Sequence, residues 1–201
     1  MKYQLARFIY WALGWKWHNN IPPNTRRFVL IALPHTSNWD FFYALFAFYL
    51  MGLPVRFTIK DSFTNGAFGW FFKSIGAIGI NRRPRKAGEE RPSMIRIMTE
   101  LFEQHDDLIL IVTPEGTRKR TDEWKMGFYH VAKAAKVPIG LGFIDYTIKE
   151  AGMGKFVTPS GDADKDMREI VEFYRPYLHA GKYPENFALD KRYAQASDTY
   201  K

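Results

Sequence analysis

The sequence predicts a single α/β domain, in which helices flank a mixed, largely parallel sheet, with an N-terminal amphipathic helix in front of it. Short apolar runs alternate along the chain with segments whose apolar residues recur at helical spacing, which is typical of α/β domains. The chain has 201 residues, enough for one domain with a sizeable core. Its 46% hydrophobic and 25% charged residues exclude a disordered, collagen-like or disulfide-scaffold protein.

Five short apolar runs are expected to form the strands. Residues 28–33 and 108–113 are continuous apolar runs with the length of buried strands, and residues 55–60 alternate between apolar and polar side chains. Residues 77–81 and 137–143 complete the set. Because helical segments separate most of these runs, the strands are expected to pair mainly in parallel.

Five segments between or after these strands are expected to form helices. They are residues 39–51, 66–74, 92–104, 123–135 and 164–179. The first belongs to the longest apolar run of the chain, which Gly52 and Pro54 end short of the roughly 20 residues that a membrane span needs. This run therefore predicts a buried helix and not a transmembrane one.

The two ends of the chain differ from the main domain, which we place at residues 23–184. Within residues 1–22, apolar side chains at helical spacing are interleaved with Trp, Lys and Arg, as in helices that lie in the plane of a membrane. A helix packed on the domain would have the same pattern, and the sequence leaves both interpretations open. Residues 185–201 are expected to form a polar, loosely held tail.

The charge balance indicates an anionic partner. Lys and Arg number 29 and Asp and Glu 21, so the net charge is +8, which suits nucleic acid, an acidic membrane surface or a phosphorylated substrate. Aromatic residues make up 17% of the chain and favour the membrane surface, where Trp and Tyr lie at the headgroup boundary. The sequence has no nucleic-acid-binding motif, so no nucleic acid is expected as a partner.

Cysteine is absent, which excludes disulfides, thiolate metal sites and a cysteine nucleophile. The first 17 residues lack the small-residue cleavage site of a secretory signal. We therefore expect a protein that is not secreted and that lies on the cytoplasmic face of a membrane, as a peripheral or monotopic protein.

The first chemical motif follows the strand at residues 28–33. His35 lies at the carboxyl end of this strand, where ligands bind in α/β domains, and Asp40 lies at the start of the next helix. An Asp placed there can reach one ring nitrogen of the His, fix its tautomer and stabilise its imidazolium form, leaving the other nitrogen as a general base. Ser37, between them, can cap the helix.

Two further motifs also follow strands. Glu115, Gly116, Thr117 and Arg118 come after the buried strand at residues 108–113. Gly116 permits a tight turn, Glu115 can accept hydrogen bonds from hydroxyl groups, and Arg118 can bind a phosphate through two hydrogen bonds. A separate stretch, residues 76–82, ends another strand in Arg82.

In this order the motifs resemble the four sequence blocks of the lysophosphatidic acid acyltransferase family of membrane glycerolipid acyltransferases. The matching residues are His35, Ser37 and Asp40; Gly76, Ile78, Ile80 and Arg82; Pro114 to Arg118; and Val137 to Ile139. Pro34 stands where the family usually has Asn, and Gly140 where it usually has a second Pro.

The resemblance implies a glycerol-3-phosphate acyltransferase-like fold and transfer of a fatty acyl group from acyl-CoA or acyl carrier protein. The implied acceptor is a phosphorylated lysophospholipid, first of all 1-acyl-glycerol 3-phosphate, which would give phosphatidic acid. His35 would take the proton of the acceptor hydroxyl, and Asp40 would orient His35. No covalent acyl-enzyme, metal or redox cofactor is implied.

The resemblance also implies the binding residues. Arg82 and Arg118 would hold the acceptor's phosphate and Glu115 its glycerol portion, with Ser37, Gly116 and Thr117 in the same substrate site. Other acceptors stay open, among them glycerol 3-phosphate and lyso-aminolipids, as does a phospholipid donor. A non-catalytic peripheral lipid-binding protein is the alternative from another class, and the paired His and Asp favour the enzyme over it.

Overall fold

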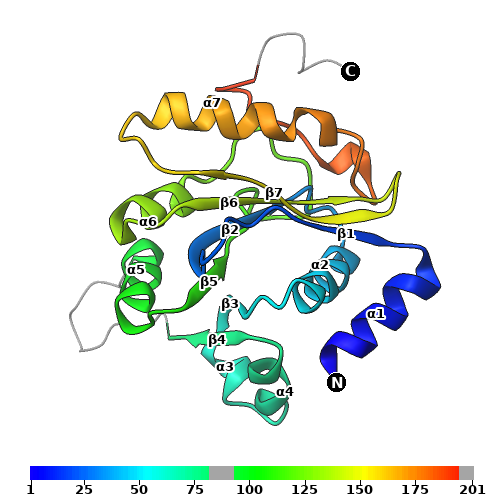
Figure 1. Ribbon diagram of the computed structural model, residues 1–201. Coiled ribbons are helices and arrows are strands. Elements are labelled where there is room, and N and C mark those ends of the chain that lie inside the picture. Colours follow the sequence, from blue (N-terminus) through cyan, green and yellow to red (C-terminus); the bar gives the residue numbers. More distant parts are fainter. Residues whose placement is uncertain (82–92, 195–201) are drawn as a thin grey trace.

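The computed structural model describes residues 1–81 and 93–194 and shows one twisted sheet between two layers of helices (Figure 1). The strands are β1 (Lys16–Asn19), β2 (Arg27–Leu33), β3 (Val55–Lys60), β4 (Ala77–Ile80), β5 (Leu108–Ile111), β6 (Ile139–Asp145) and β7 (Glu150–Val157). The α-helices are α1 (Lys2–Leu13), α2 (Asn38–Leu50), α3 (Asp61–Thr64), α4 (Gly69–Ser74), α5 (Met94–Gln104), α6 (Gly127–Ala135) and α7 (Ala163–Tyr174).

The sheet has the strand order β1-β7-β6-β2-β5-β3-β4. The β6–β7 pair is antiparallel, and all the other neighbouring pairs are parallel. This confirms the expected α/β domain with a mixed, largely parallel sheet. Because β2 and β5 are parallel neighbours, the segments that follow them leave the sheet at the same edge.

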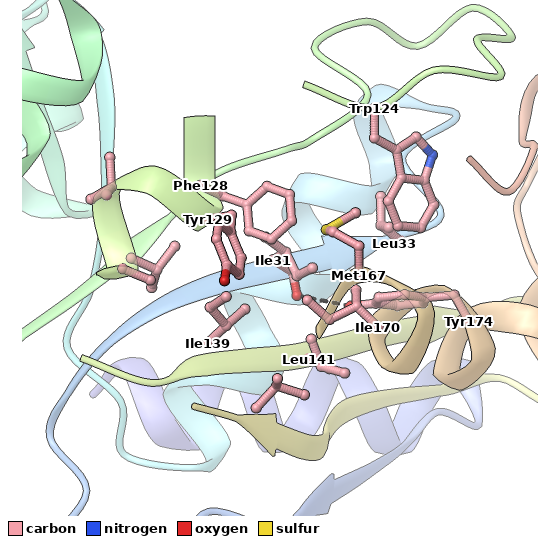
Figure 2. Close-up of a cluster of buried hydrophobic side chains, with 14 of the residues drawn as sticks. Ile31, Leu33, Trp124, Phe128, Tyr129, Ile139, Leu141, Met167, Ile170 and Tyr174 are labelled. Atoms are coloured by element: carbon pink, nitrogen blue, oxygen red, sulfur yellow. Dashed lines mark hydrogen bonds between the residues drawn. The ribbon is translucent and has the colours of Figure 1, made fainter. Parts of the chain in front are cut away.

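One face of the sheet is filled by large side chains from α5, α6 and α7. Figure 2 shows Phe128 and Tyr129 of α6 and Tyr174 of α7 packed against Ile31 of β2 and Leu141 of β6. The Tyr174 hydroxyl donates to the backbone oxygens of Ile31 and Gly142, at 3.2 and 2.8 Å. These contacts fix β2, the strand that leads into the first motif, to its neighbour β6.

The opposite face is covered by α2, with α1 packed against it (Figure 1). Ala6 and Tyr10 of α1 are buried against Ala47 and Leu50 of α2. Outside this contact α1 exposes large apolar residues: Tyr3, Leu5, Phe8, Trp11 and Leu13. The helix thus packs on the domain and also presents an apolar outer surface. In the described ranges, the helices are all too short or too polar to cross a bilayer.

Two strands of the structure were not expected from the sequence. β1 occupies residues assigned to the end of the N-terminal helix, and its four side chains are exposed, so no apolar pattern marks it. β7 contains Gly152 and Gly154. A Cβ on Gly152 would lie 2.2 Å from the His18 oxygen of β1, and one on Gly154 would meet the Phe173 ring of α7. The close approach of β1 and α7 to β7 therefore requires glycines at these positions. They replace the larger apolar residues by which a strand is recognised in a sequence.

Residues 185–194 correct the sequence prediction of a polar, loosely held tail over residues 185–201, of which residues 195–201 lie outside the described ranges. Phe187 and Leu189 belong to the main core, and Asp190 is fully buried. The buried carboxylate accepts from the Trp124 N–H and pairs with the Arg192 guanidinium at 2.6 Å. The guanidinium of Arg192, two residues along the chain, thus allows this polar segment to pack against the main core.

Candidate active site

The site forms at the carboxyl end of β2, in the middle of the sheet. His35 follows the strand by two residues, and its side chain is 18% exposed. Its Nδ1 lies 3.5 Å from Asp40 Oδ2. The structure therefore brings together the His and Asp that the sequence pairs, with one ring nitrogen turned to the carboxylate.

Asp40 is buried in the first turn of α2 and is held by the backbone that carries His35. Its Oδ2 accepts from the N–H groups of Thr36 and Ser37, at 2.6 and 2.7 Å. Ser37 is the N-cap, and its hydroxyl accepts from the Trp39 N–H at 3.2 Å. Asp40 and Ser37 thus satisfy free N–H groups at the helix start, and the same bonds fix the carboxylate beside the imidazole.

Tyr146 contributes a contact that the sequence analysis did not identify. It lies in the turn between β6 and β7, and its hydroxyl donates to Asp40 Oδ1 at 2.8 Å. Burial, and then the hydrogen bond to Asp40, raise the pKa of this phenol far above its ordinary value. It therefore acts as a hydrogen-bond donor. A single Tyr in a turn belongs to no recognisable spacing pattern, so the sequence alone does not predict its contact with Asp40.

Glu115 lies behind His35, not in open solvent. The side chain is 2% exposed, and its Oε2 accepts from the His35 N–H at 3.0 Å. Its Oε1 is buried with no hydrogen-bond partner in the part of the chain that is described. Burial raises the pKa of Glu115 to about 8; the hydrogen bond from the His35 N–H opposes this, and the nearby charge of Asp40 adds a smaller upward contribution. This carboxyl is therefore largely protonated at neutral pH.

The turn after Glu115 is exposed. Gly116 has a φ of 64°, which favours glycine, and a Cβ there would lie 2.5 Å from the Lys125 ammonium. The Thr117 hydroxyl accepts from the Lys119 N–H at 3.1 Å. Arg118 lines a cavity that also reaches His35. Arg82, the other expected phosphate ligand, lies outside the described residues.

An apolar cavity of about 510 Å³ runs from His35 and Asp40 between α2 and the sheet. Its α2 side is formed by Asp40, Phe41, Ala44, Leu45, Ala47 and Phe48. Its sheet side includes Ala32 of β2, Val55 of β3 and Gly142 of β6. From Asp40 to Phe48 the helix advances about 12 Å. The cavity thus follows about two turns of α2 away from His35 and has a mostly apolar lining.

The fold and the site define an α/β domain with a His–Asp pair at the mouth of an apolar cavity. A family model described as Acyltransferase matches residues 16–140. The chain therefore belongs to the acyltransferase family, which confirms the resemblance drawn from the four motifs.

Two individual proteins are similar to this chain. One is a 1-acyl-sn-glycerol-3-phosphate acyltransferase of Streptococcus pneumoniae (strain ATCC BAA-255 / R6), 32% identical over 142 residues, which cover 67% of this chain and 49% of that protein. The chain thus spans about half the length of this curated relative. The other is the crystal structure of the 1-acyl-sn-glycerophosphate (LPA) acyltransferase PlsC from Thermotoga maritima, with a TM-score of 0.57 and 17% identity. This similarity covers 86% of this chain and 74% of that one, and it supports the fold.

Proposed function

We propose that the protein moves a fatty acyl group from a thioester, acyl-CoA or acyl carrier protein, to a hydroxyl of a phosphorylated lysolipid. The first acceptor to consider is 1-acyl-glycerol 3-phosphate, because the curated relative is named for it. The observation that carries the proposal is the His35–Asp40 pair at the mouth of the apolar cavity. In this proposal His35 is the base, and it lies where a lipid chain held in the cavity and a reacting carbonyl would meet.

The chemistry needs one base and no covalent enzyme intermediate. The Nε2 atom of His35 takes the proton of the acceptor hydroxyl as its oxygen attacks the thioester carbonyl carbon. Asp40 stabilises the imidazolium that forms. The tetrahedral intermediate then collapses: the C–S bond breaks, the sulfur leaves, and it receives the proton from His35. The products are an ester and a free thiol.

The apolar cavity is proposed to hold the acyl chain. Burying a hydrocarbon chain is favourable by about 0.8 kcal/mol for each methylene, and the lining beyond His35 and Asp40 is mostly apolar. Arg118, at the same cavity, is proposed to bind the acceptor's phosphate, for which a guanidinium is well suited. Arg82 retains the same proposed role on the basis of its motif.

Glu115 is proposed to have two roles, one toward the catalytic segment and one toward the acceptor. The bond from the His35 N–H gives it a role in holding the catalytic segment. The family resemblance implies that Glu115 also meets the acceptor's glycerol portion, which requires its buried Oε1 to become accessible when the acceptor binds. Gly116, Thr117 and Ser37 shape the two turns from which these side chains project.

The exposed aromatic residues support a membrane-surface location. Besides the apolar residues of α1, large apolar side chains are exposed at Phe63 of α3 and at Phe68, Trp70 and Phe71 around α4. The two parts are in contact, because the Lys2 ammonium donates to the Ser74 oxygen at the end of α4. Lys2, Arg7 and Lys73 are exposed on the same elements and would meet anionic lipid. We propose that this aromatic surface rests on an anionic bilayer, from which the substrates come.

A mass-spectrometric acyl-transfer assay tests the function. Wild type, His35→Ala and the control His105→Ala, an exposed His at the end of α5, are each offered acyl-CoA and acyl carrier protein donors with lysolipids and glycerol 3-phosphate. A new ester made by wild type and His105→Ala but not by His35→Ala supports the proposal. Folded protein that binds lipid vesicles and forms no product would favour the non-catalytic lipid-binding alternative.

A further inference from the structure

The turn between β6 and β7 places Tyr146 against the carboxylate of Asp40. This residue lies beyond the segment that the family model matches, residues 16–140. Its hydroxyl donates to Asp40 Oδ1 at 2.8 Å, whereas Oδ2 is bound by backbone N–H groups and faces His35 Nδ1. The two carboxylate oxygens therefore have separate partners: Oδ2 faces His35 and the start of α2, and Oδ1 faces Tyr146.

The position of the Tyr146 ring is fixed by aromatic neighbours. Trp15 meets it edge-on at 5.2 Å between centroids, and Tyr43 of α2 does so at 5.6 Å. Trp15 in turn stacks on Tyr43 at 4.1 Å. The backbone is fixed as well, since the Tyr146 N–H donates to the Ala180 oxygen at 2.8 Å. A phenol held in this way is a preorganised donor.

We propose that Tyr146 is a positioning residue for acyl transfer: its hydroxyl holds Asp40 so that Oδ2 stays turned to His35. The inference rests on the proposed function of the His35–Asp40 pair. Because the carboxylate is buried, loss of the phenol hydroxyl would leave Oδ1 without a donor. The carboxylate would then be freer to turn away from His35.

The test is Tyr146→Phe, with Tyr129→Phe as a matched control. Tyr129 of α6 also donates to a buried carboxylate at 2.8 Å, that of Asp166, away from the cavity lining. For Tyr146→Phe we expect kcat to fall by about tenfold with the donor KM unchanged, the loss of one hydrogen bond to a charged group in the reacting arrangement. Tyr129→Phe, compared at equal folded fraction, should keep the wild-type kcat.

A second readout separates positioning from general damage. If the hydroxyl holds Oδ2 against His35, its loss weakens the contact between Oδ2 and Nδ1, so the nitrogen chemical shifts of the His35 imidazole should change in Tyr146→Phe and stay as in wild type in Tyr129→Phe. Wild-type kcat, unchanged His35 nitrogen shifts, or an equal loss in Tyr129→Phe would each overturn the proposal. If wild type itself shows no His35-dependent turnover, the proposed function fails, and the His35 nitrogen shifts alone then decide whether Tyr146 acts on the pair.

Discussion

Replacing Glu115 by Gln should remove a pH dependence from the stability of the protein. In the folded protein the pKa of Glu115 is raised from its ordinary value near 4.5 to about 8, first by burial. Between these two pH values the folded state keeps the proton and the unfolded state loses it. The free energy of unfolding contributed by this group therefore falls as pH rises from about 4.5 to 8 and is constant above and below that window.

The size of the effect follows from the same pKa. Within the window the free energy of unfolding of wild type should fall by about 1.4 kcal/mol for each pH unit relative to a variant that cannot ionise at this position. The full span corresponds to about 5 kcal/mol, and the interval from pH 5.5 to 7.5 to about 3 kcal/mol. Gln also keeps an oxygen that can accept from the His35 N–H, so the comparison isolates the charge.

The assay is urea unfolding followed by tryptophan fluorescence for wild type, Glu115→Gln and the control Glu103→Gln at four pH values from 5.5 to 8.5. Glu103 is an exposed residue of α5. The difference in unfolding free energy between wild type and Glu115→Gln should shrink or reverse in favour of the variant as pH rises. A difference that stays constant across the series would refute the reasoning, because the buried carboxyl would then ionise alike in both states.

Three further outcomes follow from the site and the surface. Arg118→Ala should raise the KM for a phosphorylated acceptor about tenfold while leaving the donor KM unchanged, and equal kinetics with such an acceptor would remove Arg118 from phosphate binding. Ala44→Phe should fill the cavity and lower kcat/KM for long acyl donors more than for short ones, whereas a uniform decrease would place the chain elsewhere. Trp11→Glu should weaken binding to anionic vesicles about tenfold and the control Ile95→Glu on α5 should not; equal binding by both variants would argue against α1 as the membrane contact.

A point substitution on α1 is more informative than its deletion. Residues 1–17 include Ala6 and Tyr10, which are buried against α2, and Trp15, which packs against Tyr43 and Tyr146. Removing the segment would therefore disturb the site and the core together. Weaker vesicle binding by a truncated protein would not distinguish a lost membrane contact from a damaged domain.

The strands that carry the motifs were predictable because they are buried on both faces. β2 and β5 are continuous apolar runs, and helical segments between them imply parallel pairing. Parallel pairing then places the residues after each strand at one edge, which brings Glu115 to the His35 backbone. The local pairing of His35 with Asp40 was likewise visible, because a capping carboxylate lies within reach of the residue before the helix.

The parts that could not be predicted depend on contacts between distant segments. β7 pairs with β1, more than 130 residues away, through a glycine that lets the two backbones approach. The buried position of Glu115 could not be read from its motif, since a charged turn after a strand is expected to be solvated. Tyr146 contacts Asp40 only because β6 and β7 form a hairpin beside α2, and no pattern in the sequence predicts that contact.

The division of side chains between the two faces of the sheet explains why the cavity lies next to His35. Trp124, Phe128 and Tyr174 fill the face covered by α6 and α7 (Figure 2), and that side is solidly packed. On the α2 face, larger apolar side chains such as Phe41 and Phe48 line the space together with a set of small residues: Ala32, Ala44, Ala47, Gly142, Ala151 and Gly152. Even a Cβ on Gly142 would come within 3.2 Å of the Leu30 side chain. The large residues on one face of the sheet hold β2 in place. The small residues on the opposite face leave an apolar space that opens beside His35, at the end of β2.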